Sequence, residues 1–211
     1  MSRILAASAV ACALAVAATA AEDEGWTPLF DGESLEGWTV SEHPYSVSVE
    51  NGQIVTHGPR AHVFYTGPVR DHVFRNFELR LEVMTEPGSN SGVYFHTEYP
   101  ADGWPAKGYE AQVNNSHTDW RRTGSLYAIE DVSEVPAADG EWFDYEISVQ
   151  GRRIVLKVNG KTTVDYTEPE SPERPPDMPG RVLSSGTFAL QCHDPGSVVH
   201  FRNIRVRALP D

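Results

Sequence analysis

Residues 89–127 read SNSGVYFHTEYPADGWPAKGYEAQVNNSHTDWRRTGSLY, and the rest of the chain is organised around them. Two segments within this stretch, Ser91–Thr97 and Tyr109–Asn114, alternate between apolar and polar side chains. Because successive side chains of a β-strand point to opposite faces, each segment is predicted to bury one face and to present a polar one. The polar faces are expected to form a platform suited to holding a sugar, made of Tyr94, His96, Glu110, Gln112 and Asn114.

Short alternating segments recur on both sides of this stretch. Turn signals such as Asn51-Gly52 separate several of them, and no segment keeps a convincing helical period. This pattern predicts an all-β fold, and a jelly-roll β-sandwich of two antiparallel sheets fits it best. Further strands are expected at residues 46–49, 53–56, 62–65, 77–83, 125–129, 142–149, 153–158, 162–166, 186–193 and 198–206.

Two segments are expected to lie outside the strands. The Pro-rich segment 169–179 is too short for a domain linker, so it is predicted to be a surface loop. The segment 26–38 is expected to dock its apolar side chains onto the core, and these are Leu29, Phe30, Leu35 and Trp38.

The first residues have the composition of an export signal. Arg3 provides a short basic start, residues 4–18 are apolar, and Ala18-Thr19-Ala20 has the small-x-small pattern of a signal-peptidase site. The apolar run is shorter than the about 20 residues that a membrane span needs. We therefore expect a signal peptide at residues 1–21 and one mature domain at residues 22–211. The mature protein is expected to be periplasmic or extracellular, with no membrane association after cleavage.

Charge and cysteine content narrow the class of protein. The formal net charge of −13 argues against nucleic acid or an anionic membrane surface as a partner, and it is compatible with a neutral sugar. Of the two cysteines, Cys12 lies in the expected signal peptide, so no intramolecular disulfide is expected. Cys192 is predicted to be a buried apolar side chain. The about 190 mature residues are enough to bury a core without a disulfide.

The polar platform offers one ionisable carboxylate. Glu110 is followed on the same face by Gln112 and Asn114, whereas an ordinary glycosidase uses two carboxylates. A solvated face without a reaction is the alternative interpretation. His193 and His96 are the histidines that we single out as candidate general acids or bases. A histidine together with a carboxylate could hold a divalent metal, but the histidine spacing singles out no ligand set.

Aromatic and basic side chains flank the platform. Trp104 and Trp120 lie in polar loops on either side of the Glu110 segment, where they can stack on sugar rings or anchor the loops. The pair Arg121-Arg122 is expected to hold its own loop through nearby aspartates rather than to contact a substrate.

Five ordered motifs cover nearly the whole expected mature chain: LFDGESLEGW at 29–38, SNSGVYF at 89–95, GYEAQV at 108–113, TGSLY at 123–127 and VHFRNIRV at 199–206. Together they resemble the 3-keto-disaccharide hydrolase family. The resemblance implies a concanavalin A-like jelly roll, export from the cytoplasm, action on 3-keto-glycosides and, as in some members, dependence on a divalent metal. The chain departs from the usual family pattern at His96, where members often carry Arg, and at Asn114-Asn115, where they often carry Asp.

The chemistry that the resemblance implies needs one base. A ketone at C3 acidifies the C2 proton, so one base can form an enolate, and the C1 aglycone then leaves by β-elimination with or without rehydration. Glu110 and His193 would provide the base or hold the metal, with the division between them left open. A separate glycoside 3-oxidoreductase would supply the substrate. Contacts with the hydroxyls or the ring of the substrate, or with the developing oxyanion, would come from His96, Gln112, Asn114, Tyr127, Tyr94 and Trp104.

Two other interpretations stay open from the residues alone. A lectin-like carbohydrate-binding module could use the same platform without changing the sugar, because one fold serves both roles. A structural envelope protein without a ligand is the third interpretation.

Overall fold

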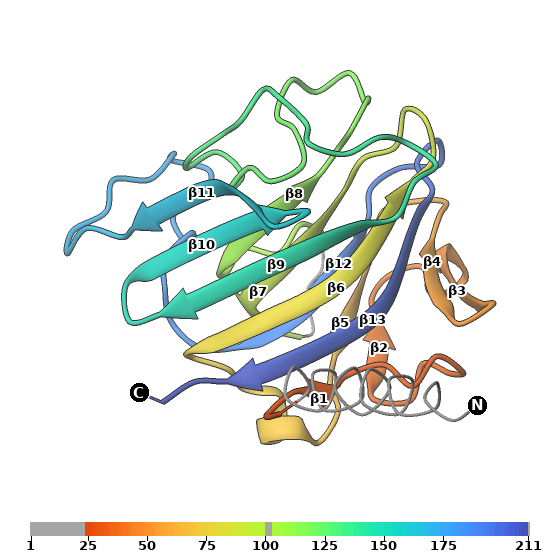
Figure 1. The fold of residues 1–211 in the computed structure, drawn as a ribbon, viewed down its shortest axis with the longest axis horizontal. Helices are drawn as coiled ribbons and strands as arrows, with labels where there is room; N and C mark the ends of the chain where they lie inside the picture. The colour runs from red at the N-terminus through yellow and green to blue at the C-terminus, as the bar shows by residue number, and fades with distance from the viewer. Residues whose placement is uncertain (1–23, 100–102, 211) are drawn as a thin grey trace, which may run out of the picture.

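The computed structural model describes residues 24–99 and 103–210, which form two stacked antiparallel sheets (Figure 1). The larger sheet has the strand order β11-β10-β9-β6-β13-β4-β3, with β1 paired to β13. The smaller sheet has the order β2-β5-β12-β7-β8. This arrangement is the predicted concanavalin A-like β-sandwich.

The strand bounds follow the alternating segments of the sequence. The larger sheet contains β1 (Thr27–Pro28), β3 (Val47–Glu50), β4 (Gln53–Thr56), β6 (Phe77–Thr85), β9 (Phe143–Gln150), β10 (Arg153–Val158), β11 (Lys161–Thr167) and β13 (Val199–Ala208). The smaller sheet contains β2 (Trp38–Val40), β5 (Ala61–Tyr65), β7 (Ser91–Thr97), β8 (Tyr109–Val113) and β12 (Thr187–Cys192). Two short 3-10 helices lie at Pro44–Ser46 and Val69–His72.

The larger sheet buries only one of its faces. In β6 every second side chain is buried, from Phe77 to Thr85, and β9 repeats the pattern from Phe143 onward. The side chains between them point outward and form cross-strand ion pairs, such as Arg80 with Glu146. This alternation is what an antiparallel sheet with one wet face requires.

The smaller sheet is buried on both faces. Every residue of β7, β8 and β12 is buried, although their sequences alternate between apolar and polar side chains. The apolar side chains, such as Val93 and Phe188, pack in the core between the sheets. Their polar neighbours face away from the core and lie beneath loops. The predicted polar platform is therefore the floor of a covered cavity, which corrects the expectation of an exposed face.

The expected strands agree with the structure except in two places. Residues 125–129 are predicted as a strand, but Leu126 forms only isolated bridges, to Ala111 and Glu130. The backbone has a positive φ at Gly124 and at Ala128, which is incompatible with a continuous strand. The strands β1 and β2 are not predicted, because two or three residues are too few for an alternating pattern.

The predictions for the N-terminal segment and for the cysteine are confirmed. Leu29, Phe30 and Trp38 are buried, and Leu35 packs against the core. Cys192 is free and buried, and this burial raises the pKa of its thiol to about 12. The predicted signal peptide lies outside the described residues. Among those that are described, none belongs to a helix with the length and apolar character needed to cross a bilayer.

Candidate functional site

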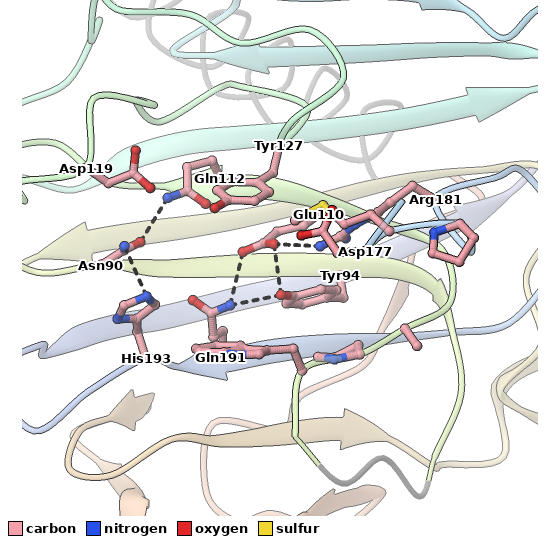
Figure 2. Close-up of a pocket in the computed structure, with 15 residues that line it drawn as sticks. Asn90, Tyr94, Glu110, Gln112, Asp119, Tyr127, Asp177, Arg181, Gln191 and His193 are labelled. Carbon is pink, nitrogen blue, oxygen red and sulfur yellow. Dashed lines mark hydrogen bonds and ion pairs between the residues drawn. The ribbon is translucent and has the colours of Figure 1, made fainter. Parts of the chain in front are cut away.

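A cavity of about 500 Å³ opens on the outer face of the smaller sheet (Figure 2). This volume lies within the range of small-molecule sites. The floor comes from β7, β8 and β12, and loop residues 104–106, 119, 127, 177–179 and 181 form the walls. Six predicted site residues line the cavity, namely Tyr94, Trp104, Glu110, Gln112, Tyr127 and His193.

Strand register brings the floor residues together. Tyr94 pairs with Glu110 across β7 and β8, and it pairs with Ala189 across β7 and β12. Gln191 follows Ala189 by two residues, so its side chain lies on the same face of the sheet. Gly92 also belongs to this face, and a Cβ there would lie 2.4 Å from Oε1 of Glu110. The absence of a side chain at Gly92 therefore makes room for the carboxylate.

Three donors hold the buried carboxylate of Glu110. Its Oε2 accepts hydrogen bonds from Tyr94 Oη at 2.8 Å and from Arg181 Nη2 at 3.1 Å. Its Oε1 accepts one from Gln191 Nε2 at 3.0 Å. Burial raises the pKa of Glu110, although the charge of Arg181 and these hydrogen bonds oppose the shift. A cavity carboxylate with a raised pKa is suited to accept a proton from a bound ligand.

The same network orients two glutamine amides at the floor. Because the Glu110 carboxylate only accepts, Gln191 turns its Nε2 toward it, while Gln112 Nε2 donates to Asn90 Oδ1 at 2.9 Å. The side-chain oxygens of Gln112 and Gln191 are buried and have no hydrogen-bond partner within the described part of the chain. Two buried acceptors without donors indicate a ligand that supplies hydroxyl groups.

His193 presents one ring nitrogen to the cavity and holds a carboxylate with the other. Its Nδ1 lies 2.7 Å from Asp194 Oδ2, and its Nε2 lies 3.3 Å from Asn90 Nδ2. Since the carboxylate accepts and the amide nitrogen donates, the ring carries its proton on Nδ1. Partial burial acts to raise the pKa of Asp194, but hydrogen bonds from His193, Ser197 and Gly196 bring this pKa below its usual value.

A donor set for a metal lies at this edge of the cavity. One ligand atom each from His117, His193 and Asp194 can be chosen so that all lie within 4.8 Å of one another. Two imidazoles and a carboxylate are the ligands that zinc and similar divalent ions prefer. The residues present therefore fit the divalent metal that the family resemblance implies.

His96 does not reach the cavity. The residue has a positive φ of 56°, and the pairing of β12 with β7 shifts register beside it. Its ring packs edge-on against Phe77 and Phe95, and its nitrogens bond the backbone of Arg75 and Ser184. Burial lowers the pKa of His96 to about 4. The irregularity thus breaks the alternation from which a place on the platform was predicted.

Asn114 also lies outside the cavity, because it follows the end of β8 and its amide holds a loop. Its Nδ2 donates to the carbonyls of Asp119 and Arg121, and its Oδ1 accepts from the backbone of His117 and from the Arg122 guanidinium. The prediction that Arg121 and Arg122 hold this loop is confirmed, since Arg121 also pairs with Asp131 at 2.9 Å.

The two tryptophans differ in position. Trp104 lines the cavity with 46% of its surface exposed, and its ring centroid lies 5.3 Å from that of His193. Trp120 is 55% exposed and carries the Arg121 guanidinium over its ring, but it is not among the lining residues. Only Trp104 therefore keeps the predicted place beside the floor.

The sequence interpretation missed several lining residues. Gln191 is predicted to face the same way as His193, which is confirmed, but it was not assigned to the site. Asn90 and Arg181 come from loops, where no periodicity predicts the direction of a side chain. Arg181 follows the Pro-rich segment that was predicted to be a surface loop, yet it is 5% exposed. Two more carboxylates also line the walls, Asp119 and Asp177.

Known proteins similar to the chain agree with the sequence motifs. The model of a family described as "3-keto-alpha-glucoside-1,2-lyase-like domain" matches residues 25–207. The "3-keto-disaccharide hydrolase" of Bacteroides thetaiotaomicron is 26% identical over 231 aligned residues, which cover 88% of this chain and 79% of that protein.

Solved structures are similar in fold. Two crystal structures of candidate glycosyl hydrolases from Parabacteroides distasonis match with TM-scores of 0.75 and 0.68. The first is 22% identical and the match covers 90% of this chain and 96% of that one. The second is 24% identical, with 87% of this chain and 99% of that one covered. At these identities the likeness shows the shared fold alone.

Proposed function

Because the chain belongs to the family of 3-keto-alpha-glucoside-1,2-lyase-like domains, we propose that it cleaves the glycosidic bond of 3-keto-glycosides. The observation that carries this proposal is the buried Glu110 carboxylate, which three donors hold in the cavity. Beside it, the Oε1 atoms of Gln112 and Gln191 have no hydrogen-bond partner among the described residues. The name of the Bacteroides relative, a 3-keto-disaccharide hydrolase, supports the same substrate class.

The proposed reaction begins with transfer of the C2 proton to Glu110. The electrons of the C2–H bond form a C2–C3 double bond, and the C3 carbonyl becomes an enolate. When the carbonyl forms again, the electrons of the C2–C3 double bond form a C1–C2 double bond, and the C1–O bond breaks with its electrons on the aglycone oxygen. The aglycone leaves with the proton that Glu110 gives up, which regenerates the base. Addition of water across the resulting C1–C2 double bond completes a net hydrolysis, whereas release of the enone is a lyase reaction. This route requires one base and stabilisation of an oxyanion.

The other cavity residues are assigned by their hydrogen-bonding capacity. Gln112 and Gln191 offer buried acceptor oxygens for substrate hydroxyls, and Tyr127 and Trp104 provide aromatic walls for the ring. His193 would hold a divalent metal together with His117 and Asp194. When bound, such a metal would supply Lewis acidity toward a substrate oxygen.

We further propose that residues 1–21 direct export and that the domain acts in the periplasm or outside the cell. Because the substrate carries a ketone at C3, an enzyme that oxidises the C3 hydroxyl of a glycoside must act before this one.

The proposal is tested with a chromogenic 3-keto-glucoside and its unoxidised parent, each with and without chelator. We expect release of the aglycone from the keto form only. The E110Q variant, which keeps the shape of the side chain but cannot take a proton, should lower kcat by about 100-fold or more. Equal release from both sugars would contradict the enolate route. Binding of either sugar without release would assign the protein to the lectins.

A further inference from the structure

Arg181 is the only arginine among the residues that line the described cavity (Figure 2). It belongs to the wall formed by the loop between β11 and β12. Its side chain is 6% exposed, and its Nη2 lies 3.1 Å from Oε2 of Glu110. The guanidinium carbon lies 5.3 Å from the ring centre of Tyr94 and 5.9 Å from that of Tyr127. The backbone N–H of Arg181 donates to the Met178 carbonyl, which fixes the start of the side chain.

One nitrogen of this guanidinium has no hydrogen-bond partner among the described residues. Nη1 of Arg181 is buried and makes no hydrogen bond to any described residue, although Nη2 is paired. A buried cationic donor without an acceptor is costly, so the site indicates a ligand that supplies one. Both Nη atoms are bonded to the same carbon, so this acceptor would lie beside the carboxylate of Glu110.

Arg181 and Glu110 lie side by side, as groups that act on neighbouring atoms of a substrate must. The base must reach the proton on C2 while negative charge develops on the oxygen of the adjacent C3. We propose that Arg181 stabilises this oxygen through Nη1 as Glu110 removes the C2 proton, an inference that rests on the proposed function. No other reactant is needed. The electrons of the C2–H bond move into the enolate, and they then form the C1–C2 double bond as the aglycone leaves with the electrons of the C1–O bond.

A purely structural role for Arg181 makes a different prediction. If the guanidinium only balances the charge of Glu110, its removal makes that carboxylate harder to ionise. Activity would then return at high pH, where the carboxylate ionises. If Arg181 stabilises the enolate, activity stays low at every pH at which the protein is folded. The two roles are therefore separated by the pH profile of kcat.

The experiment compares R181Q, R181K and R202Q with the unmodified protein on the 3-keto-glucoside between pH 5 and 9. Arg202 is the control, because it is an arginine of the larger sheet that pairs with a carboxylate, that of Glu82 at 2.6 Å, and it does not line the cavity. We expect R181Q to lose about 100-fold or more in kcat at every pH, with little change in KM. R181K should lose less because it keeps a charge, and R202Q should stay within a few-fold of the unmodified protein.

Added guanidinium provides a second readout. It should restore part of the kcat of R181A, because a free cation can occupy the vacated position, and it should not accelerate R202Q. Recovery of R181Q to nearly full activity at high pH, or an equal loss in R202Q, would overturn the inference while leaving the proposed function in place. Absence of cleavage by the unmodified protein would instead overturn the proposed function, and this inference with it. Thermal melts confirm that each variant is folded.

Discussion

At the scale of single residues, burial determines which groups are available for chemistry. Glu110 and His62 both lie on the smaller sheet, and both are buried. Glu110 has three hydrogen-bond donors around its carboxylate. His62 has neither ring nitrogen bonded to any described residue, and its ring contacts Tyr94 and Trp104 edge-on. The donors around Glu110 stabilise the ionised form of its carboxylate, whereas burial of His62 favours the neutral form of its ring.

Because His62 is buried, we expect the free energy of unfolding to fall in acid. Burial lowers the pKa of His62 to about 3 from 6.5. Between these values the unfolded chain binds a proton at this ring that the folded chain does not, so the free energy of unfolding falls as the pH drops below 6.5. The variant H62L should remove about 2 kcal/mol of the loss between pH 7.5 and 5, as measured by urea unfolding.

The control for this measurement is H72N, at an exposed histidine whose positive φ asparagine tolerates. It should leave the acid dependence of the unfolding free energy close to that of the unmodified protein. If H62L loses stability in acid as steeply as the unmodified protein, the buried ring does not account for the effect.

At the scale of strands, the pairing of β7 with β8 positions the carboxylate of Glu110. The pairing places Gly92 opposite Gln112 and Tyr94 opposite Glu110, so four side-chain positions share one patch of the floor. Strand pairs hold such positions more rigidly than loops do, which suits a group that must meet one proton of a substrate.

Adding a single methyl group at Gly92 is therefore expected to lower the activity strongly. In G92A the new Cβ would lie 2.4 Å from Oε1 of Glu110, so the carboxylate must move. We expect kcat on the 3-keto-glucoside to fall about 100-fold or more, because small displacements of a catalytic group are costly.

The matched control is G67A, where the Cβ would lie 2.5 Å from the Tyr65 hydroxyl, which is not among the residues lining the cavity. This variant should lower the melting temperature but keep kcat within a few-fold. Equal losses of kcat in the two variants would show that general destabilisation, not the position of Glu110, is responsible.

At the scale of the whole molecule, the sandwich brings loops from distant parts of the chain over one sheet. His117 lies in the loop after β8, whereas His193 and Asp194 directly follow β12, and their ring and carboxylate atoms meet at one edge of the cavity. A ligand that joins these loops would bind the folded chain but not the unfolded one, so it would stabilise the fold.

Divalent metal should therefore raise the melting temperature. At 100 times its dissociation constant, a ligand that binds only the folded state adds about 2.7 kcal/mol. We expect Zn²⁺ or Mn²⁺ to shift the melting midpoint upward by several degrees and chelator to reverse the shift. The variant H117Q should respond less. An equal shift in H117Q, or none in the unmodified protein, would contradict the assignment of these three residues.

The alternation of side chains determined the sandwich and much of the site. Strands such as Ser91–Thr97 and Arg153–Val158 have the predicted bounds, because burial on one face requires a period of two in the sequence. The same period predicted that Glu110 and Gln112 share a face with Tyr94. Three of the five family motifs lie on strands, namely β7, β8 and β13, so the membership of the chain could be expected from its residues.

Which groups meet in the cavity depends on contacts between distant parts of the chain. The side chain of His96 lies away from the platform because the residue has a positive φ and the strand pairing shifts register beside it. A periodic sequence pattern predicts neither of these irregularities. Arg181 pairs with Glu110 because a loop far along the chain folds back over the smaller sheet. The direction of a loop side chain depends on long-range contacts and not on local sequence. For this reason the place of Glu110 in the cavity was predictable from the sequence, whereas its cationic partner was not.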